Sequence, residues 1–410
     1  MNIQKNITMP VLIKYLLFLL SFLVFIAPFP FFSFFVPAFL LIILTGKVRF
    51  SSSDTPVWIF LALYTIVSLI SLINAIDMET GLAYFRFSIY LCLLMLFVSA
   101  LIYSYGYEPI GIIFKGSTFL ILISAIASLA GLFGILPIYD QVTLWDRLSG
   151  FCGNPNYYGL ALNFCVMYLY YKMGLSGKIG RIKNLAALML LVFTLLLTYS
   201  RAGWIGLVVS IICYSFFIAV QSQSKTALLR FIAGIIGLIV FIGSAWLVAD
   251  AFDYTERIRM RFEAQEYDVD RFMVHDILLE KSLEHPLGVG PGQISIYLSN
   301  FYNNIKGADA AESSYLEVLF ERGYMGEALY LLLLVYLLFL SFRISLFSWE
   351  FAKISAAVTS IFYGMLVFSF IGDTTYFLHF WIISGMICGL NILYSREREL
   401  RGRQPVMITS

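Results

Sequence analysis

Apolar residues in this chain gather into long runs that polar segments separate. A transmembrane helix needs roughly 20 mainly apolar residues. By that measure the pattern predicts about twelve membrane-spanning helices, at residues 11–27, 29–45, 57–75, 86–104, 110–135, 157–172, 185–200, 202–220, 231–250, 324–342, 354–371 and 377–394. Most connections between them are too short to hold a folded domain, so we expect a single transmembrane domain over residues 1–410.

One long polar segment, residues 251–323, interrupts this pattern and holds thirteen of the acidic residues. We expect any active site to lie in it. Residues 270–284 are predicted to form a helix that the Gly/Pro-rich run at 285–292 ends. Ser314 and Glu317 have the spacing of a capping box, which predicts a short helix through Phe320, with Gly323 as its stop.

Composition supports a membrane protein. Hydrophobic residues make up 60% of the chain, charged residues 13%, and the mean hydropathy is +0.86, whereas soluble domains are typically about a quarter charged. The net charge of +2 is too small to indicate nucleic acid as a partner. The five cysteines show no CxxC or Cys/His metal spacing, so neither a disulfide framework nor a zinc site is expected. We therefore expect an all-α polytopic membrane protein with one large extracytoplasmic loop.

The distribution of Lys and Arg predicts the orientation, because these residues accumulate in short cytoplasmic loops. With the N-terminus inside, seventeen of the 27 basic residues fall on the inner side. Both termini are then cytoplasmic, and the 251–323 loop faces outward together with two shorter polar segments, 139–158 and 198–204. The connection at 103–109 carries no Lys or Arg, so the distribution of these residues does not assign it to a side of the membrane.

Arg201 stands in a short outer turn between two apolar runs. A guanidinium near hydrocarbon is costly, so it snorkels to the interface, pairs with a carboxylate or binds another anion. Its planar fork of donors suits phosphate. Arg147 and Arg271 also face outward and would complete an arginine clamp, although for each alone a solvated loop charge is the favoured interpretation.

Glu312 is the candidate general base. It follows two alanines and precedes a helix start, where burial would raise its pKa toward the working range. The alternative is a capping role at that helix, together with Asp309 or through the helix dipole, and the rarity of catalytic residues favours this alternative. Asp268 and Asp270 form a DxD pair, but a loop this acidic produces such pairs by chance, so no metal site is predicted. The chain has no P-loop, GxGxxG or Ser/His/Asp pattern.

Four stretches, in this order, resemble the O-antigen ligase and O-antigen polymerase superfamily of bacterial cell envelopes. They are Gly-Asn-Pro-Asn at 153–156, Thr-Tyr-Ser-Arg-Ala-Gly at 198–203, the segment 271–292 with its Pro-Leu-Gly-Val-Gly-Pro-Gly ending, and Ala-Glu-Ser-Ser-Tyr-Leu at 311–316 continuing through Glu-Arg-Gly-Tyr-Met-Gly at 321–326. Each piece alone is weak, but their order and their placement between apolar runs are specific.

This resemblance implies a multi-spanning glycosyltransferase with a C-type fold. Its substrates would be undecaprenyl-diphosphate-linked oligosaccharides on the outer face of the bacterial cytoplasmic membrane, and it would need no metal or other cofactor. Flippase and chain-length regulator proteins are implied as candidate partners, beside the lipid bilayer. The pyrophosphate would be held by Arg201, Arg271 and Arg147, and the remaining substrate-binding positions would be Asn156, Gly290, Gly292 and Tyr315.

Two activities of the superfamily, and one of another class, compete for this chain. A polymerase joins lipid-linked repeat units to each other, whereas a ligase moves the finished glycan to a lipid A core, a protein or another surface acceptor. Ligases resembling this chain carry His-Asn where it has Glu312-Ser313, which favours a polymerase. A flippase or transporter ranks third, because such proteins place charges in mid-membrane and the predicted spans are almost free of charge.

Overall fold

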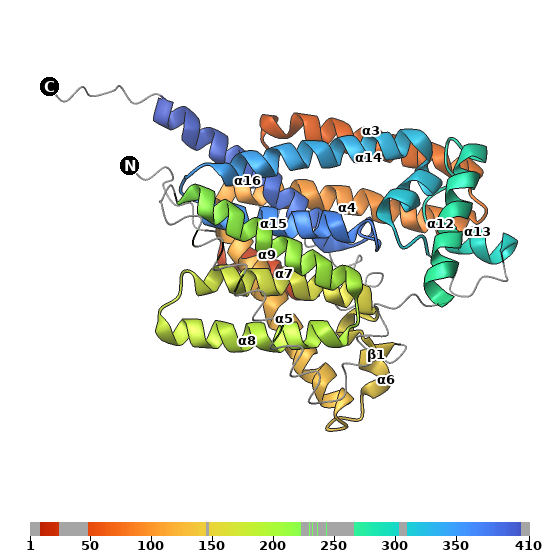
Figure 1. The fold of residues 1–410 in the computed structure, drawn as a ribbon. Helices are drawn as coiled ribbons and strands as arrows, with labels where there is room; N and C mark the ends of the chain where they lie inside the picture. Colours follow the sequence, from red (N-terminus) through yellow and green to blue (C-terminus); the bar gives the residue numbers. More distant parts are fainter. Residues whose placement is uncertain are drawn as a thin grey trace.

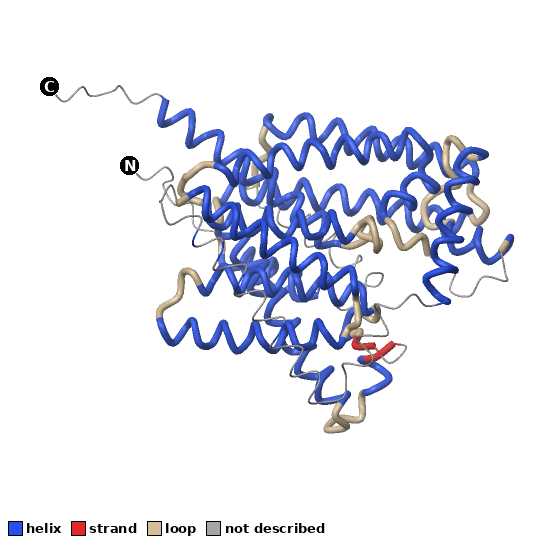
Figure 2. Tube along the Cα trace, viewed as in Figure 1, coloured by secondary structure: helices blue, strands red, loops and turns tan. Residues whose placement is uncertain are grey.

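The computed structural model describes residues 9–23, 48–144, 147–222, 266–302 and 310–402, with isolated residues at 229, 232, 236 and 243. These parts are helical except for one two-stranded hairpin and the connecting turns (Figure 2). The long helices are α1 (Val11–Leu23), α3 (Thr55–Ser71), α4 (Met78–Tyr105), α5 (Glu108–Leu132), α7 (Pro155–Met173), α8 (Lys178–Leu197), α9 (Arg201–Gln221), α12 (Glu266–Glu284), α14 (Ser314–Leu346), α15 (Ala352–Phe368) and α16 (Leu378–Gly402). Shorter elements are α6 (Tyr139–Val142), α13 (Ile294–Phe301), the 3-10 turns η1 (Ser52–Asp54), η2 (Leu72–Asn74) and η3 (Gly150–Cys152), and the antiparallel pair β1 (Thr143–Leu144) and β2 (Arg147–Leu148).

The described helices confirm an all-α polytopic membrane protein. Seven of them are long and apolar enough to cross a bilayer: α3 with its flanking turns, α4, α5, α8, α9, α14 and α16. α1 and α15 are apolar but shorter, and α7 is buried along most of its length. Ten of the twelve predicted spans therefore fall on described helices, whereas 29–45 and nearly all of 231–250 lie outside the described residues.

Segments predicted for the inner side lie together at one end of the bundle. Lys14 of α1 forms an ion pair with Glu108 at the start of α5. The backbone N–H of Arg49 donates to Ser104 Oγ over 2.8 Å, and the Arg396 guanidinium lies 5.2 Å from the centre of the Tyr103 ring. The 103–109 connection, which charge alone did not place, is thus at the end where α1 begins and α16 ends.

The polar segment caps the opposite end. Figure 1 shows α12 and α13 at one end of the bundle and the C-terminal part of α16 at the other. The cap is fastened to the α3–α4 connection: Asn74 Nδ2 donates to Gly288 O over 2.9 Å, and Asp77 N–H donates to Gln293 Oε1 over 2.9 Å. It also has a small core of its own, separate from the main one, which includes Leu278, Leu298 and Phe320.

One sequence prediction for this segment needs correction. α14 does begin at Ser314, but its N-cap, Ser313, makes no side-chain capping bond, so the capping box is wrong. The Ser314 hydroxyl instead contacts Thr374 Oγ1 at 3.0 Å, because a neighbouring connection packs against this helix start. The predicted stop at Gly323 is confirmed: with φ 67° and ψ −173° the backbone leaves the helical conformation there, and a second helical part of α14 follows and runs to Leu346.

Candidate functional site

The turn between α8 and α9 presents Arg201 at a helix N-terminus. Ser200 is the N-cap of α9, and its Oγ accepts from Gly203 N–H over 3.2 Å. Arg201 is the first residue of the helix and is half-buried. A helix N-terminus carries a partial positive charge and unpaired N–H groups, so it favours anions. The guanidinium adds a full charge at the same point.

Hydrogen bonds from Asn156 and Arg147 hold this turn in place. Asn156 Oδ1 accepts from Arg147 Nη2 over 2.9 Å and from Ser200 Oγ over 3.0 Å. Arg147 Nε donates to Thr198 O, at the C-terminal end of α8, over 2.9 Å. Further along α7, Asn163 Nδ2 donates to Gly203 O over 2.7 Å. Positions 156 and 163 share a helix face because seven residues make two turns, so one face of α7 holds the start of α9. The structure therefore brings Arg147 and Asn156 beside the Arg201 turn, as the resemblance implied.

Glu312 lies immediately before α14 and has a strained backbone. Its φ is +46°, and Tyr199, two residues before Arg201, has φ +50°. These are the two non-glycine residues with positive φ in the described parts of the chain. Tyr199 stands in the predicted Arg201 turn, and Glu312 stands in the predicted motif before α14. Such a conformation costs an L-residue about 1 to 2 kcal/mol, and strain of this kind gathers at functional sites.

The flanks of Glu312 are fixed by two other segments. The Nε2 atom of His275, on α12, lies 2.8 Å from Ala311 O. On the other flank, Ser314 N–H donates to Ser369 O over 3.0 Å. Arg271 precedes His275 by one turn of α12, so the two positions share a helix face. The side chain of Arg271 itself lies outside what the structure describes.

The connection between α15 and α16 joins the two motifs. Tyr157 OH, next to Asn156 on α7, donates to Asp373 Oδ2 over 3.1 Å. Asp373 also accepts from Thr375 N–H over 2.7 Å. Its neighbour Thr374 donates its backbone N–H to Ser314 Oγ, at the start of α14, over 2.7 Å. Sequence reasoning missed Asp373 and Tyr157. A signal was available, because Asp373 is the single charged residue between Lys353 and Arg396.

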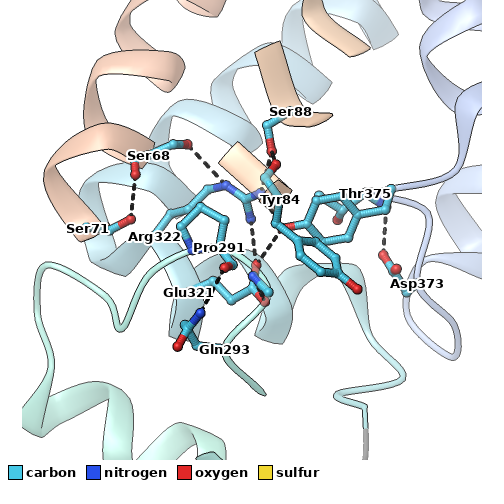
Figure 3. Close-up of polar contacts among 12 residues, drawn as sticks. Ser68, Ser71, Tyr84, Ser88, Pro291, Gln293, Glu321, Arg322, Asp373 and Thr375 are labelled. Carbon is cyan, nitrogen blue, oxygen red and sulfur yellow. Dashed lines mark hydrogen bonds and ion pairs between the residues drawn. The ribbon is translucent and has the colours of Figure 1, made fainter. Parts of the chain in front are cut away.

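A buried ion pair lies behind these contacts, at the break in α14. Arg322 is fully buried and Glu321 is 2% exposed. Arg322 Nη1 lies 3.2 Å from Glu321 Oε2, and Nη2 donates to Tyr376 OH over 2.8 Å, which in turn donates to Glu321 Oε2 over 2.8 Å (Figure 3). Burial raises the pKa of Tyr376 well above its ordinary value, so the phenol stays neutral and can donate.

Serines and tyrosine rings complete the shell around Arg322. Its Nε donates to Ser68 Oγ over 3.2 Å and its Nη2 to Ser88 Oγ over 3.1 Å. Its guanidinium carbon lies 5.2 Å from the Tyr64 ring and 5.4 Å from the Tyr376 ring. Buried ion pairs are retained where such additional hydrogen bonds offset the loss of water. The pair therefore ties α14 to α3 and α4.

The glycine-rich turn packs against the break in α14. Gly290 N–H donates to Glu321 O over 2.9 Å, and Gly292 N–H donates to Glu321 Oε1 over 2.7 Å. A Cβ atom on Gly292 would lie 2.3 Å from the Tyr84 ring. Gly290 and Gly292, both predicted to bind substrate, thus contact other parts of the chain. The lack of a side chain permits this close contact. Tyr315, the fourth such position, is half-buried with its ring 4.5 Å from that of Phe370.

The arrangement offers a glutamate on an anchored backbone, cationic side chains near a helix N-terminus and a second group of carboxyls linked to both motifs. Within the described ranges, no group of three or more His, Cys, Asp or Glu side chains is spaced to hold a metal ion. Of Asp268 and Asp270 the structure describes the backbone but not the side chains.

A comparison with protein families finds one match in this region. The family described as O-antigen ligase matches residues 186–331. This range contains three of the four stretches that carry the resemblance: the Arg201 turn at 198–203, the segment 271–292 and the segment 311–326 with Glu312. A search of curated proteins finds no match to the chain.

Proposed function

We propose that this chain is a polysaccharide polymerase of the O-antigen ligase and O-antigen polymerase superfamily, a proposal that the family match at residues 186–331 supports. It is a membrane glycosyltransferase-like protein whose family works on lipid-linked oligosaccharides. In the proposal it joins undecaprenyl-diphosphate-linked repeat units on the outer face of the bacterial cytoplasmic membrane.

The observation that supports this best is the strained and doubly anchored backbone at Glu312. A general base must be held within hydrogen-bonding reach of the proton that it removes. Glutamate has no intrinsic preference for positive φ, so the surroundings of residue 312 maintain a conformation that the residue itself disfavours. His275 on one side and Ser369 on the other supply that constraint.

In the proposed reaction, Glu312 accepts the proton of an acceptor hydroxyl, whose oxygen then forms a bond to the anomeric carbon of the donor glycan. The bond from that carbon to the diphosphate breaks, and undecaprenyl diphosphate leaves as an anion. Arg201, Arg271 and Arg147 stabilise the charge that develops on it. Arg147 has a second task, since it also holds the turn that carries Arg201.

Orientation and partners form part of the same proposal. The end that carries Lys14, Arg396 and Arg401 faces the cytoplasm, as basic loops do, and the capped end faces outward. Flippase and chain-length regulator proteins are the proposed partners, because a polymerase needs repeat units on the outer face and a limit on chain length.

Glu312→Gln tests the base. Glutamine keeps the shape of the side chain but cannot accept the proton, so activity should fall about 100- to 10,000-fold. The measurement is the ladder of undecaprenyl-linked glycans in cells with equal amounts of protein, where single repeats should remain on the carrier. Glu280→Gln, at an exposed position of α12, is the matched control and should leave the ladder intact.

The companion variant Arg201→Lys keeps the charge but loses the planar fork, and should shorten the glycans less than Arg201→Ala does.

Two outcomes would redirect the assignment. An unchanged ladder in Glu312→Gln returns Glu312 to a purely structural role. Long lipid-linked chains that accumulate without reaching a surface acceptor identify a ligase, which would use the same base and clamp on another acceptor.

A further inference from the structure

Glu317, Asp373 and Tyr157, which we call the carboxyl cluster, have no task in the reaction described above. Glu317 lies on the first turns of α14, Asp373 in the α15–α16 connection and Tyr157 at the start of α7. Ser314, about one turn before Glu317 on α14, accepts from the N–H of Thr374, next to Asp373, and Tyr157 OH donates to Asp373. Figure 3 shows Tyr84 and Asp373 on the same side of the Arg322 network.

The cluster has hydrogen-bonding capacity that the described protein does not use. Glu317 is 8% exposed, yet its Oε2 receives no hydrogen bond from any described residue. Burying such an atom without a partner costs free energy. Asp373, in contrast, is half-buried, so the cluster has an open side. An unpaired buried oxygen beside an open side is suited to a ligand that brings its own donors.

The chemistry of the cluster selects the kind of ligand. Two neighbouring carboxyl groups offer several acceptor sites, and a carboxyl that carries its proton also offers an O–H donor. Neighbouring sugar hydroxyls, each both donor and acceptor, match that set. A diphosphate does not, because its charge repels carboxylates. The ring of Tyr157, 5.6 Å from that of Phe377 at an interplanar angle of 22°, adds the apolar surface that ligand sites combine with a few polar groups.

The position of the cluster is also specific. Tyr157 adjoins Asn156, which bonds to Ser200 beside Arg201, and Glu317 follows Glu312 by five residues. The cluster is thus linked to both motifs, to the Arg201 turn through Tyr157 and Asn156 and to the Glu312 segment through the first turns of α14.

We propose that Glu317, Asp373 and Tyr157 form the subsite that binds hydroxyl groups of the acceptor sugar. This inference rests on the proposed function and extends it by assigning the acceptor side. Because a site built for hydroxyls is left with unpaired polar groups when they are missing, it discriminates strongly against sugars that lack them.

The test uses the purified full-length protein in lipid nanodiscs and dicyclohexylcarbodiimide, an apolar reagent that modifies protonated carboxyls. A carboxyl oxygen adds to the carbodiimide carbon while the proton moves to nitrogen. Peptide mass spectrometry should find the modification on Glu317 or Asp373. Lipid-linked repeat units extracted from a strain that lacks this gene should slow it about tenfold at roughly ten times their Kd. Undecaprenyl diphosphate without sugar should not slow it.

Three results would overturn the proposal: no modification of either carboxyl, no protection by the lipid-linked repeat units, or equal protection by sugar-free undecaprenyl diphosphate. The Glu312→Gln protein separates this inference from the proposed function. If Glu312→Gln abolishes the ladder and wild-type protein shows no protection, the acceptor subsite is wrong while the polymerase assignment stands. If protection is seen but Glu312→Gln keeps its ladder, the subsite stands and the assigned base is wrong.

Discussion

At the scale of single residues, the buried pair of Glu321 and Arg322 is the strongest constraint near the site. Arg322→Met should destabilise the protein by about 3 to 5 kcal/mol, because it leaves the carboxylate of Glu321 buried without its partner. The measurement is thermal unfolding of the purified protein in detergent. Adding Glu321→Gln removes the remaining charge, so the double variant should be more stable than Arg322→Met alone. A double variant that is no more stable would show that Arg322 acts through packing and not through its charge.

At the scale of elements, the break in α14 depends on two glycines that face each other. Gly323 has φ 67° and ψ −173°, a region that essentially only glycine adopts. A Cβ atom there would lie 2.2 Å from Pro286 O, and one on Gly288 would lie 2.3 Å from Glu321 O. The freed backbone groups are paired across this contact, since Tyr324 N–H donates to Pro286 O over 3.1 Å.

Gly323→Ala should therefore destabilise the protein by about 2 to 6 kcal/mol, from backbone strain and the forced contact together. Gly111→Ala is the matched control. Gly111 lies in α5 with no atom within 4 Å of a built Cβ, and alanine in a helix is more stable than glycine by about 0.5 to 1 kcal/mol. Thermal unfolding of the two variants side by side decides the matter, and equal stabilities would mean that the break does not need glycine.

At the scale of the whole molecule, the proposed orientation predicts which end can be reached from outside. Leu283, 72% exposed on α12, and Leu400, 46% exposed near the end of α16, mark the two ends. The five native cysteines are buried or half-buried. In intact cells a membrane-impermeant thiol reagent should modify Leu283→Cys and leave Leu400→Cys unmodified. In permeabilised cells the reagent should modify both variants. The reverse pattern in intact cells would invert the topology.

The sequence by itself determined the class of fold and the place of the candidate site. Runs of apolar residues predict spanning helices because every backbone polar group in a bilayer must be bonded within the segment. Predicted spans such as 110–135 therefore reappear as helices, here α5, and the polar segment that interrupts the runs does form the cap. The Arg201 turn and Glu312 were found because polar residues between spans are few, and the match to the O-antigen ligase family lies over the same region.

Only the tertiary structure decided what these residues contact. Asp373 and Glu317 are 56 positions apart in the chain, and the pattern of apolar residues says nothing about which outer connections meet. The stop at Gly323 follows from the local pattern, but only the fold shows that Pro286, far away in the chain, accepts a hydrogen bond from Tyr324 N–H where the next helix begins. The predicted capping box failed because Ser314 finds a partner in Thr374, from another connection. Helix formation depends on neighbours along the chain, whereas polar pairing in a packed bundle depends on neighbours in space.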